Sequence, residues 1–258
     1  SKAISISLAS NEVTMRPLRI QLSSSATANS VGDVTIYAVV GGSNVTSMRV
    51  TVVAKTAPTA APRQHPFLFF SSSEIPGILS KAASFAWAGN SLGNILGWGP
   101  QVLAANVNVI PLEPTYWPGY YVCSNGQYLV FDINSPRSHY CSSEDKNYTG
   151  QPYDGSWISS VHNKNLDYAL RAALSYTFSG NVTVGQVAVQ VLYNYALVYP
   201  SLPYHGTDGY TTLNVVSGGR IHSETLSEAS WAFNVAWTFD LAYPLLTNQQ
   251  RTVIEFNL

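Results

Sequence analysis

The sequence predicts a multidomain β + α protein, in which a small N-terminal β-sandwich-like module precedes a larger domain of antiparallel helix pairs. Up to about residue 55 the chain alternates with a period of two and is rich in Val, Ile and Thr, as strands are. From Trp157 onward it shows helix-length segments with short breaks, at Phe178–Asn181 and at Tyr243-Pro244. The domains we expect are a β module over 1–56, a Pro-rich linker over 57–66 and a helical domain over 67–258.

Four candidate strands make up the N-terminal module: Ile4–Leu8, Val13–Leu22, Asp33–Val40 and Ser47–Val53. The Gly-Gly-Ser-Asn turn between the last two predicts a β-hairpin. Because a module of about 55 residues supplies only a thin core, we expect it to pack on a neighbour or to self-associate through an exposed strand edge. The alternative is a passive spacer.

A linker and two short helices are expected next. The segment Lys55–Pro66 holds three prolines without hydrophobic periodicity, which is typical of a semi-extended linker. Ser71–Pro76 is a helix-start signal with proline in the first turn, so we expect a helix to about Ala88 and another over Gln101–Val107. From Ile110 to Gly155 the chain is dense in Tyr, Trp, Pro and Gly, and we expect an ordered irregular segment there.

The last third carries explicit helix signals. Thr183 and Gln186 form a capping-box pattern for a helix that ends at Tyr199-Pro200, and Thr247 and Gln250 repeat the pattern. In the helix that begins near Ser223, apolar residues recur at spacings of three and four and predict one side that faces the core. That side comprises Leu226, Ala229, Phe233, Ala236 and Trp237, with Trp231 expected in the core as well.

Composition and charge exclude several classes of partner. Only 10% of the residues are charged, against roughly 25% in a typical soluble protein, and the net charge is −1. Such a chain has no long-range attraction for nucleic acids or anionic membranes. It has no apolar run of about 18 residues, so no membrane span is expected. A surface rich in hydroxyl and amide groups suits an extracellular or cell-surface location, and without a recognisable signal peptide we take the chain as a mature form.

The two cysteines and three sequons agree with that location. Cys123 and Cys141 can close a disulfide loop worth roughly 3 kcal/mol on the chain-entropy model. A metal site is the weaker alternative, since no histidine or further cysteine lies at zinc-finger spacing, and we expect no metal and no cofactor. Three N-x-S/T sequons predict glycosylation at Asn44, Asn147 and Asn181.

Several segments together resemble heparinase II/III-like and alginate-lyase-like polysaccharide lyases. In those proteins an alanine-rich helix ends in an Ala-Tyr-x-x-Thr-Gly-Asp/Asn turn, and the next helix ends in Tyr-Ala-x-x-Tyr-Pro. The segments similar to these here are Leu170–Asn181 and Tyr195–Pro200. The similarity extends to Tyr148–Asp154, to Gly218–Trp231, to Ala236–Leu241 and to Phe69–Pro76. It covers roughly residues 67 to 258.

The resemblance implies an incomplete (α/α) toroid whose helix pairs surround a groove for an acidic polysaccharide. It also implies cleavage by β-elimination, in which a base removes the C5 proton of a uronic acid and a tyrosine protonates the leaving oxygen. The Asn-His pair and the tyrosine that catalyse this reaction in the family lie in later helices, so we expect a continuation beyond Leu258. The alternatives are a structural filament glycoprotein that assembles through the β module, and a non-catalytic sugar-binding module.

Candidate binding residues lie in four stretches. His162 and Asn163 stand near a helix start, where the histidine either meets a sugar carboxylate or bonds to a neighbouring loop. Arg220, His222 and Glu224 follow two glycines that permit close approach to the backbone, and the arginine either pairs with a uronate or with Glu224 or Glu228. The remaining candidates are Tyr204 and His205, as groove wall or acid–base pair, and Trp117 and Tyr120, as a sugar-stacking surface or as loop core.

Overall fold

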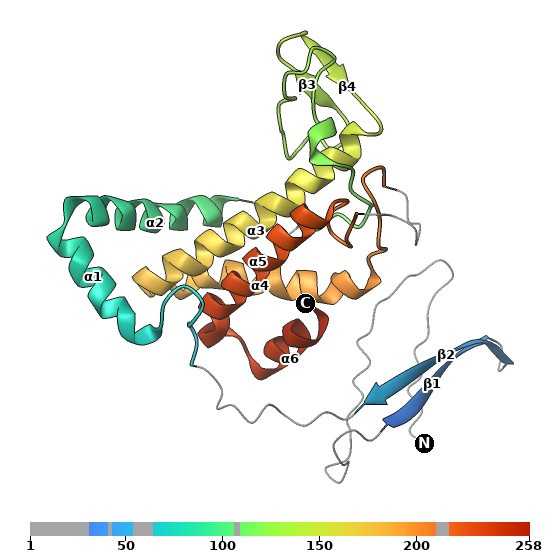
Figure 1. Cartoon of the computed structure of the whole chain (residues 1–258), viewed down its shortest axis with the longest axis horizontal. Coiled ribbons are helices and arrows are strands. Elements are labelled where there is room, and N and C mark those ends of the chain that lie inside the picture. The colour runs from blue at the N-terminus through green and yellow to red at the C-terminus, as the bar shows by residue number, and fades with distance from the viewer. Residues whose placement is uncertain (1–30, 41–42, 54–63, 106–108, 210–216) are drawn as a thin grey trace. The chain divides into compact units, whose positions relative to one another are not determined.

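The computed structural model describes residues 31–40, 43–53, 64–105, 109–209 and 217–258 (Figure 1). The chain divides into two compact units, Ser1–Pro62 and Arg63–Leu258. In the first unit, β1 (Val31–Val40) and β2 (Ser43–Val53) pair antiparallel, with Val31 opposite Val53 and a register shift between Ala38 and Val39. This pairing confirms the hairpin that the sequence predicts.

The predicted fold class is wrong. The described residues are mostly helical, and their only sheets are two-stranded, so they contain no β-sandwich. A period of two identifies a strand but not its partner, and β1 and β2 pair with each other without the second sheet that a sandwich requires. In place of the expected β-sandwich joined to an incomplete (α/α) toroid, the described residues form a mostly helical unit and a β-hairpin. The candidate strands Ile4–Leu8 and Val13–Leu22, and most of the linker, lie outside the described residues.

Six helices are described in the second unit: α1 (Ile75–Ser84), α2 (Ala86–Ala104), α3 (Tyr153–Ser179), α4 (Val182–Val198), α5 (Thr225–Ala242) and α6 (Asn248–Asn257). Helix α3 is the central one and packs against α2, α4 and α5, while α6 packs against α4 (Figure 1). The apolar core lies between these helices and includes Leu166, Leu192, Tyr195, Ile221, Trp231 and Leu241.

Helix α2 corrects two predicted boundaries. The first helix ends at Ser84, and α2 then runs without interruption to Ala104, so the separate helix over Gln101–Val107 was wrong. The glycines and the proline within this segment disfavour a helix in isolation. Packing reverses that preference, because Gly99 is buried and a Cβ there would lie only 3.2 Å from Ser175 Oγ and 3.4 Å from Val184 Cγ2. A small residue at this position lets α2 approach the α3–α4 pair.

The helix ends show one confirmed and one wrong capping prediction. The Thr247–Gln250 capping box at the start of α6 is present. At the start of α4, however, the N-cap is Asn181, whose side-chain oxygen accepts from the Val184 backbone N–H. Gly180 takes the left-handed conformation at the end of α3, with φ 69°. This turn ends α3 and lets Asn181 act as the N-cap of α4.

The predicted core-facing side of α5 is the wrong one. Leu226 is 71% exposed and Phe233 is 62% exposed, whereas Trp231, Val235 and Leu241 are buried. The helix is apolar around most of its circumference, so periodicity alone does not select the side that faces the core. Packing against α3 and α4 selects it, and of the two tryptophans only Trp231 is fully in the core.

Candidate functional site

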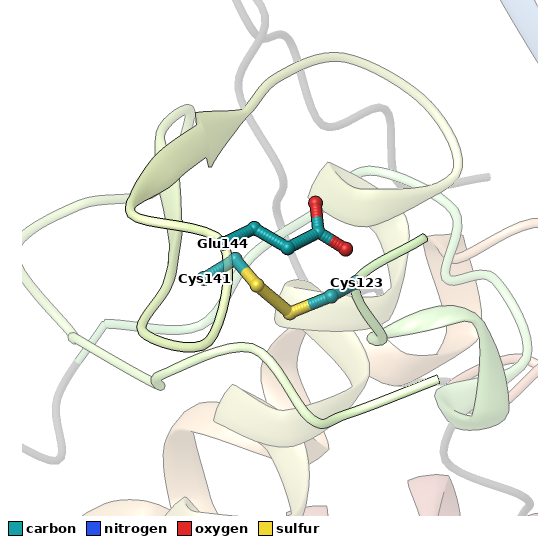
Figure 2. A group of neighbouring side chains, drawn as sticks. All are labelled: Cys123, Cys141 and Glu144. Carbon is teal, nitrogen blue, oxygen red and sulfur yellow. A yellow bond between two sulfur atoms is a disulfide. The ribbon is translucent and has the colours of Figure 1, made fainter. Parts of the chain in front are cut away.

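A disulfide lobe, residues 110–152, precedes the central helix and holds two short strands, β3 (His139–Cys141) and β4 (Lys146–Tyr148). Cys123 and Cys141 form the predicted disulfide, with a Cα–Cα distance of 5.9 Å. Figure 2 shows the Glu144 side chain beside the two sulfur atoms. Because the sulfur atoms are bonded to each other, they offer no thiolate to a metal ion.

Glu144 organises the lobe instead. Its carboxylate accepts hydrogen bonds from the Tyr148 hydroxyl at 2.6 Å and the Ser124 hydroxyl at 2.7 Å. These bonds, with Lys146 at 2.9 Å, lower the pKa of Glu144 to about 2. The carboxylate therefore stays ionised and ties the two ends of the disulfide loop together.

The sequence did not reveal a chain of polar groups in the lobe, which is buried at His139 and Asp154 and exposed at Arg137 and Glu113. His139 lies between the Tyr121 hydroxyl, 3.0 Å from Nδ1, and Asp154 Oδ1, 3.0 Å from Nε2. Arg137 bonds to Asp154 at 3.1 Å and also pairs with Glu113. Both ring nitrogens of His139 are satisfied, which is the arrangement of a structural histidine.

Three buried histidines come together at the centre of the helical unit, and we call them the histidine cluster. His162 lies on α3, His205 follows α4, and His222 precedes α5; none is more than 1% exposed. The rings of His162 and His222 have centroids 6.1 Å apart and are nearly perpendicular. All three residues are candidates from the sequence, and the fold brings them together from separate stretches.

His162 is held by two polar residues of the core. Its Nδ1 lies 2.8 Å from the hydroxyl of Tyr195 on α4, which in turn accepts from Asn165 Nδ2 at 3.3 Å. Burial lowers the pKa of His162 well below its usual range, and His222 and His205 lower it further. Asn165 is one helical turn from His162, so its place beside the histidine follows from α-helical spacing, although the sequence analysis did not select it.

His222 has one satisfied ring nitrogen and one that is unsatisfied. Its Nδ1 lies 2.9 Å from the Ser159 hydroxyl, whereas its buried Nε2 has no hydrogen-bond partner within the described part of the chain. Burial lowers the pKa of His222 to about 4, and His205 contributes in the same direction. The ring is therefore neutral near neutral pH, and its Nε2 bonds to no group of the residues that the structure describes.

His205 connects the cluster to the start of the disulfide lobe. The Thr115 backbone N–H donates to its Nε2 at 3.0 Å, so that nitrogen carries no proton and the ring is neutral. Its Nδ1 lies 3.1 Å from the Pro203 carbonyl, and burial lowers its pKa. Two residues along, the Trp117 backbone N–H donates to the Thr207 carbonyl, so the 113–121 segment runs beside the His205 loop.

Trp117 and Tyr120 form an exposed aromatic pair, which we call the aromatic step. Their rings meet edge to face with centroids 5.4 Å apart, and they are 45% and 38% exposed. The Ser156 hydroxyl of α3 donates to the Trp117 carbonyl at 2.8 Å, which fixes the step to the same helix that carries His162. These residues are therefore partly exposed surface and not the interior of the loop.

Four other candidates do not join the cluster. Asn163 is exposed on α3, and Tyr204 is 43% exposed. Glu224 precedes α5 and accepts from the Ser227 hydroxyl. The Arg220 guanidinium donates through Nη1 to the carbonyls of Pro200 and Leu202, whereas the expected link to Glu228 is made by the Arg220 backbone N–H.

Glu228 is the clearest residue that sequence reasoning did not place in the site. Its carboxylate accepts from the backbone N–H groups of Arg220 and Ile221 at 3.1 Å and of His222 at 2.7 Å. The Tyr199 hydroxyl also donates to it, at 3.1 Å. In the sequence, Glu228 is an acidic residue in the first turns of a helix that follows a Gly-Gly loop. This pattern is too common to identify Glu228 as a site residue.

The predicted glycosylation sites lie on the outside. Asn147 is exposed on β4, and Asn181 is exposed at the α3–α4 turn; Asn44 lies on β2, where only the backbone is described. A hollow between α1 and α2 is lined mostly by apolar side chains, including Trp87, Leu92 and Phe178. None of the candidate binding residues lines it, so it is separate from the histidine cluster.

No protein-family model matches the chain, and no curated protein is similar enough to count as a relative. The similarity to polysaccharide lyases therefore stays a prediction. None of the helices in the described ranges combines the length and the hydrophobicity that crossing a bilayer requires.

Proposed function

We propose that the protein binds an acidic, uronate-containing polysaccharide and acts on it by β-elimination, with the aromatic step as the sugar-binding surface and the histidine cluster as the source of the base. One observation carries the proposal. Candidates chosen from distant stretches of the sequence, Trp117, His205 and His222, are linked through one backbone segment and one central helix. Trp117 and His222 bond to Ser156 and Ser159, which lie one helical turn apart on α3, so the exposed aromatic rings and the neutral His222 imidazole are fixed to the same end of one helix.

The chemistry of the cluster suits proton transfer. A base that removes the C5 proton must be neutral beforehand, and burial keeps His222 neutral down to a pH of about 4. An anionic uronate nearby favours the protonated ring and so raises the pKa of His222, which makes the base stronger when substrate is bound. The Tyr195 hydroxyl lies 2.8 Å from Nδ1 of His162, and burial raises the pKa of Tyr195, so its phenol keeps the proton that a leaving oxygen needs.

Because the histidine cluster is buried, the proposed reaction requires that substrate binding uncover the His222 ring. His162, His222 and Tyr195 are covered by protein, whereas the aromatic step is exposed. A sugar chain can stack on the step at once, but it reaches His222 only when binding uncovers the ring. Binding and cleavage must therefore be measured separately.

We further propose an extracellular or cell-surface location, which the disulfide and the exposed positions of Asn147 and Asn181 support. Intact-mass measurement before and after enzymatic removal of glycans tests this in protein from a eukaryotic secretory host. Loss of mass at the two asparagines is expected, and an unmodified chain would count against secretion.

The experiment for the function uses alginate, polygalacturonate, hyaluronan and heparin. Product is followed by the ultraviolet absorbance of the new C4–C5 double bond, and binding by retention on the immobilised polysaccharide. We expect His222→Gln to lower the rate by about 10²-fold or more with retention intact. Trp117→Ala should weaken binding by about tenfold, as loss of roughly 1.4 kcal/mol of ring contact would.

Trp87→Ala is the matched control, because Trp87 is also an exposed tryptophan but lies in the α1–α2 hollow. Its retention and rate should equal those of the unaltered protein. Neither product nor retention with any of the four polysaccharides would reject the proposed function.

A structural glycoprotein is the second candidate. Among the described residues β1 and β2 pair only with each other, so each has an unpaired edge that could add a strand from another copy. Polymers in the native preparation, seen by light scattering and lost when 1–56 is deleted, would favour this candidate over the lyase.

A further inference from the structure

The loop that carries His222 is folded around a carboxylate. Three successive backbone N–H groups, those of Arg220, Ile221 and His222, all donate to Glu228, and the shortest bond is the 2.7 Å bond from His222 itself. Successive N–H groups that converge on one anion form a nest, which is a strong fixed binding site for negative charge. Here the anion is a side chain of the protein.

Gly219 makes this approach possible. A Cβ at that position would overlap the Glu228 carboxyl group, so any larger residue would push the carboxylate away from the loop. The sequence predicted that these glycines let a ligand approach the backbone, and the group that approaches in this structure is Glu228.

Glu228 is also connected to the far side of the cluster. Tyr199 donates its hydroxyl to the carboxylate and stacks on Trp231, with centroids 5.6 Å apart and planes within 3°. Trp231 meets Tyr195 edge to face at 5.3 Å, and Tyr195 bonds to His162. One carboxylate therefore contacts the backbone of His222 directly and the surroundings of His162 through two aromatic rings.

We propose that Glu228 is a positioning residue, which holds the 219–222 loop so that the His222 ring keeps Nδ1 on Ser159 and leaves Nε2 unoccupied. The effect on catalysis rests on the proposed function. The effect on the orientation of His222 does not, and it can be measured without any substrate.

Glu228→Gln tests the proposal, because an amide keeps the shape but has one acceptor oxygen in place of two. The readout is NMR of the ¹⁵N-labelled histidine side chains, which reports the tautomer and the titration of each ring. We expect the His222 titration to move from about 4 towards its ordinary value of 6.5 as the loop loosens and water reaches the ring. With a polysaccharide that the protein cleaves, kcat should fall by about 10²-fold while KM changes little.

Two further variants keep the test decisive. Gly219→Ala displaces the carboxylate by steric overlap with no change in charge, so it should shift the same His222 resonances even if Glu228→Gln does not fold. Glu255→Gln removes an exposed carboxylate from α6 and should leave all histidine resonances unchanged.

An unchanged tautomer and titration of His222 in both Glu228→Gln and Gly219→Ala would overturn the positioning role. If the unaltered protein neither binds nor cleaves any polysaccharide, the proposed function fails, while the NMR comparison still decides the role of Glu228.

Discussion

The disulfide lobe and the helical core each bury a histidine, but they satisfy it differently. In the lobe, His139 has a phenol on one ring nitrogen and the Asp154 carboxylate on the other. In the core, the rings of His162 and His222 contact a phenol and a serine hydroxyl, and among the described residues no carboxylate bonds to either ring. A buried histidine with two hydrogen-bond partners stabilises the fold. A buried histidine with an unsatisfied ring nitrogen lowers the free energy of unfolding, but that nitrogen can bond to a ligand.

The carboxylate near the core histidines is placed on the backbone and not on a ring. Glu228 bonds to the N–H of His222, so it fixes the position of the ring without supplying a counter-charge to the imidazole. A carboxylate thus has different contacts in the two regions: Asp154 bonds directly to the His139 ring, whereas Glu228 bonds to the backbone of His222.

The largest expected loss of stability follows from removing Asp154, the carboxylate that bonds to His139. Asp154→Ala leaves buried His139 and part of Arg137 without an acceptor, and it should lower the free energy of unfolding by about 3 kcal/mol or more. Urea unfolding followed by circular dichroism measures this. Asp167→Ala, which removes an exposed carboxylate paired with Arg171 on the same helix, should cost no more than about 0.5 kcal/mol. Equal costs would mean that the chain of polar groups contributes nothing beyond a surface pair.

The buried histidines of the cluster should make the free energy of unfolding depend on pH in a defined direction. Because the folded pKa of His222 is about 4 and its unfolded value is 6.5, only the unfolded state takes up a proton between these values. The contribution is fully present above pH 6.5 and is lost as the pH falls towards 4, by about 3 kcal/mol for this residue. His162 acts in the same direction.

Urea unfolding at a series of pH values, repeated on His222→Gln, measures this dependence. The variant should lose less stability between pH 6.5 and 4 than the unaltered protein does. Identical curves for the two proteins would show that His222 is not the group that titrates on unfolding.

The smallest effect is expected from a matched pair of tyrosines. Tyr121→Phe and Tyr195→Phe each remove a hydroxyl that bonds to a buried histidine, and each should cost about 1 kcal/mol of stability. Only Tyr195→Phe should also lower product formation from a polysaccharide, because only it changes the surroundings of the histidine cluster. If both variants lost activity, or neither did, the prediction that only the histidine cluster takes part in product formation would be wrong.

The sequence by itself determined the local elements and the covalent link. The period-two pattern determined β1 and β2, the Thr247–Gln250 cap determined the start of α6, and two cysteines in one loop determined the disulfide. These features depend on residues near each other in the chain, whose conformational preferences and spacing are visible in the sequence.

The tertiary structure alone decided how the elements are combined. It decided that β1 and β2 form a hairpin with no further strand among the described residues, and that α5 buries Trp231 while Phe233 stays exposed. It also decided that Asn165 and Glu228 join the histidines while Asn163 and Glu224 do not. These choices depend on which faces of distant helices meet, and a chain that is apolar on several faces leaves that decision to packing.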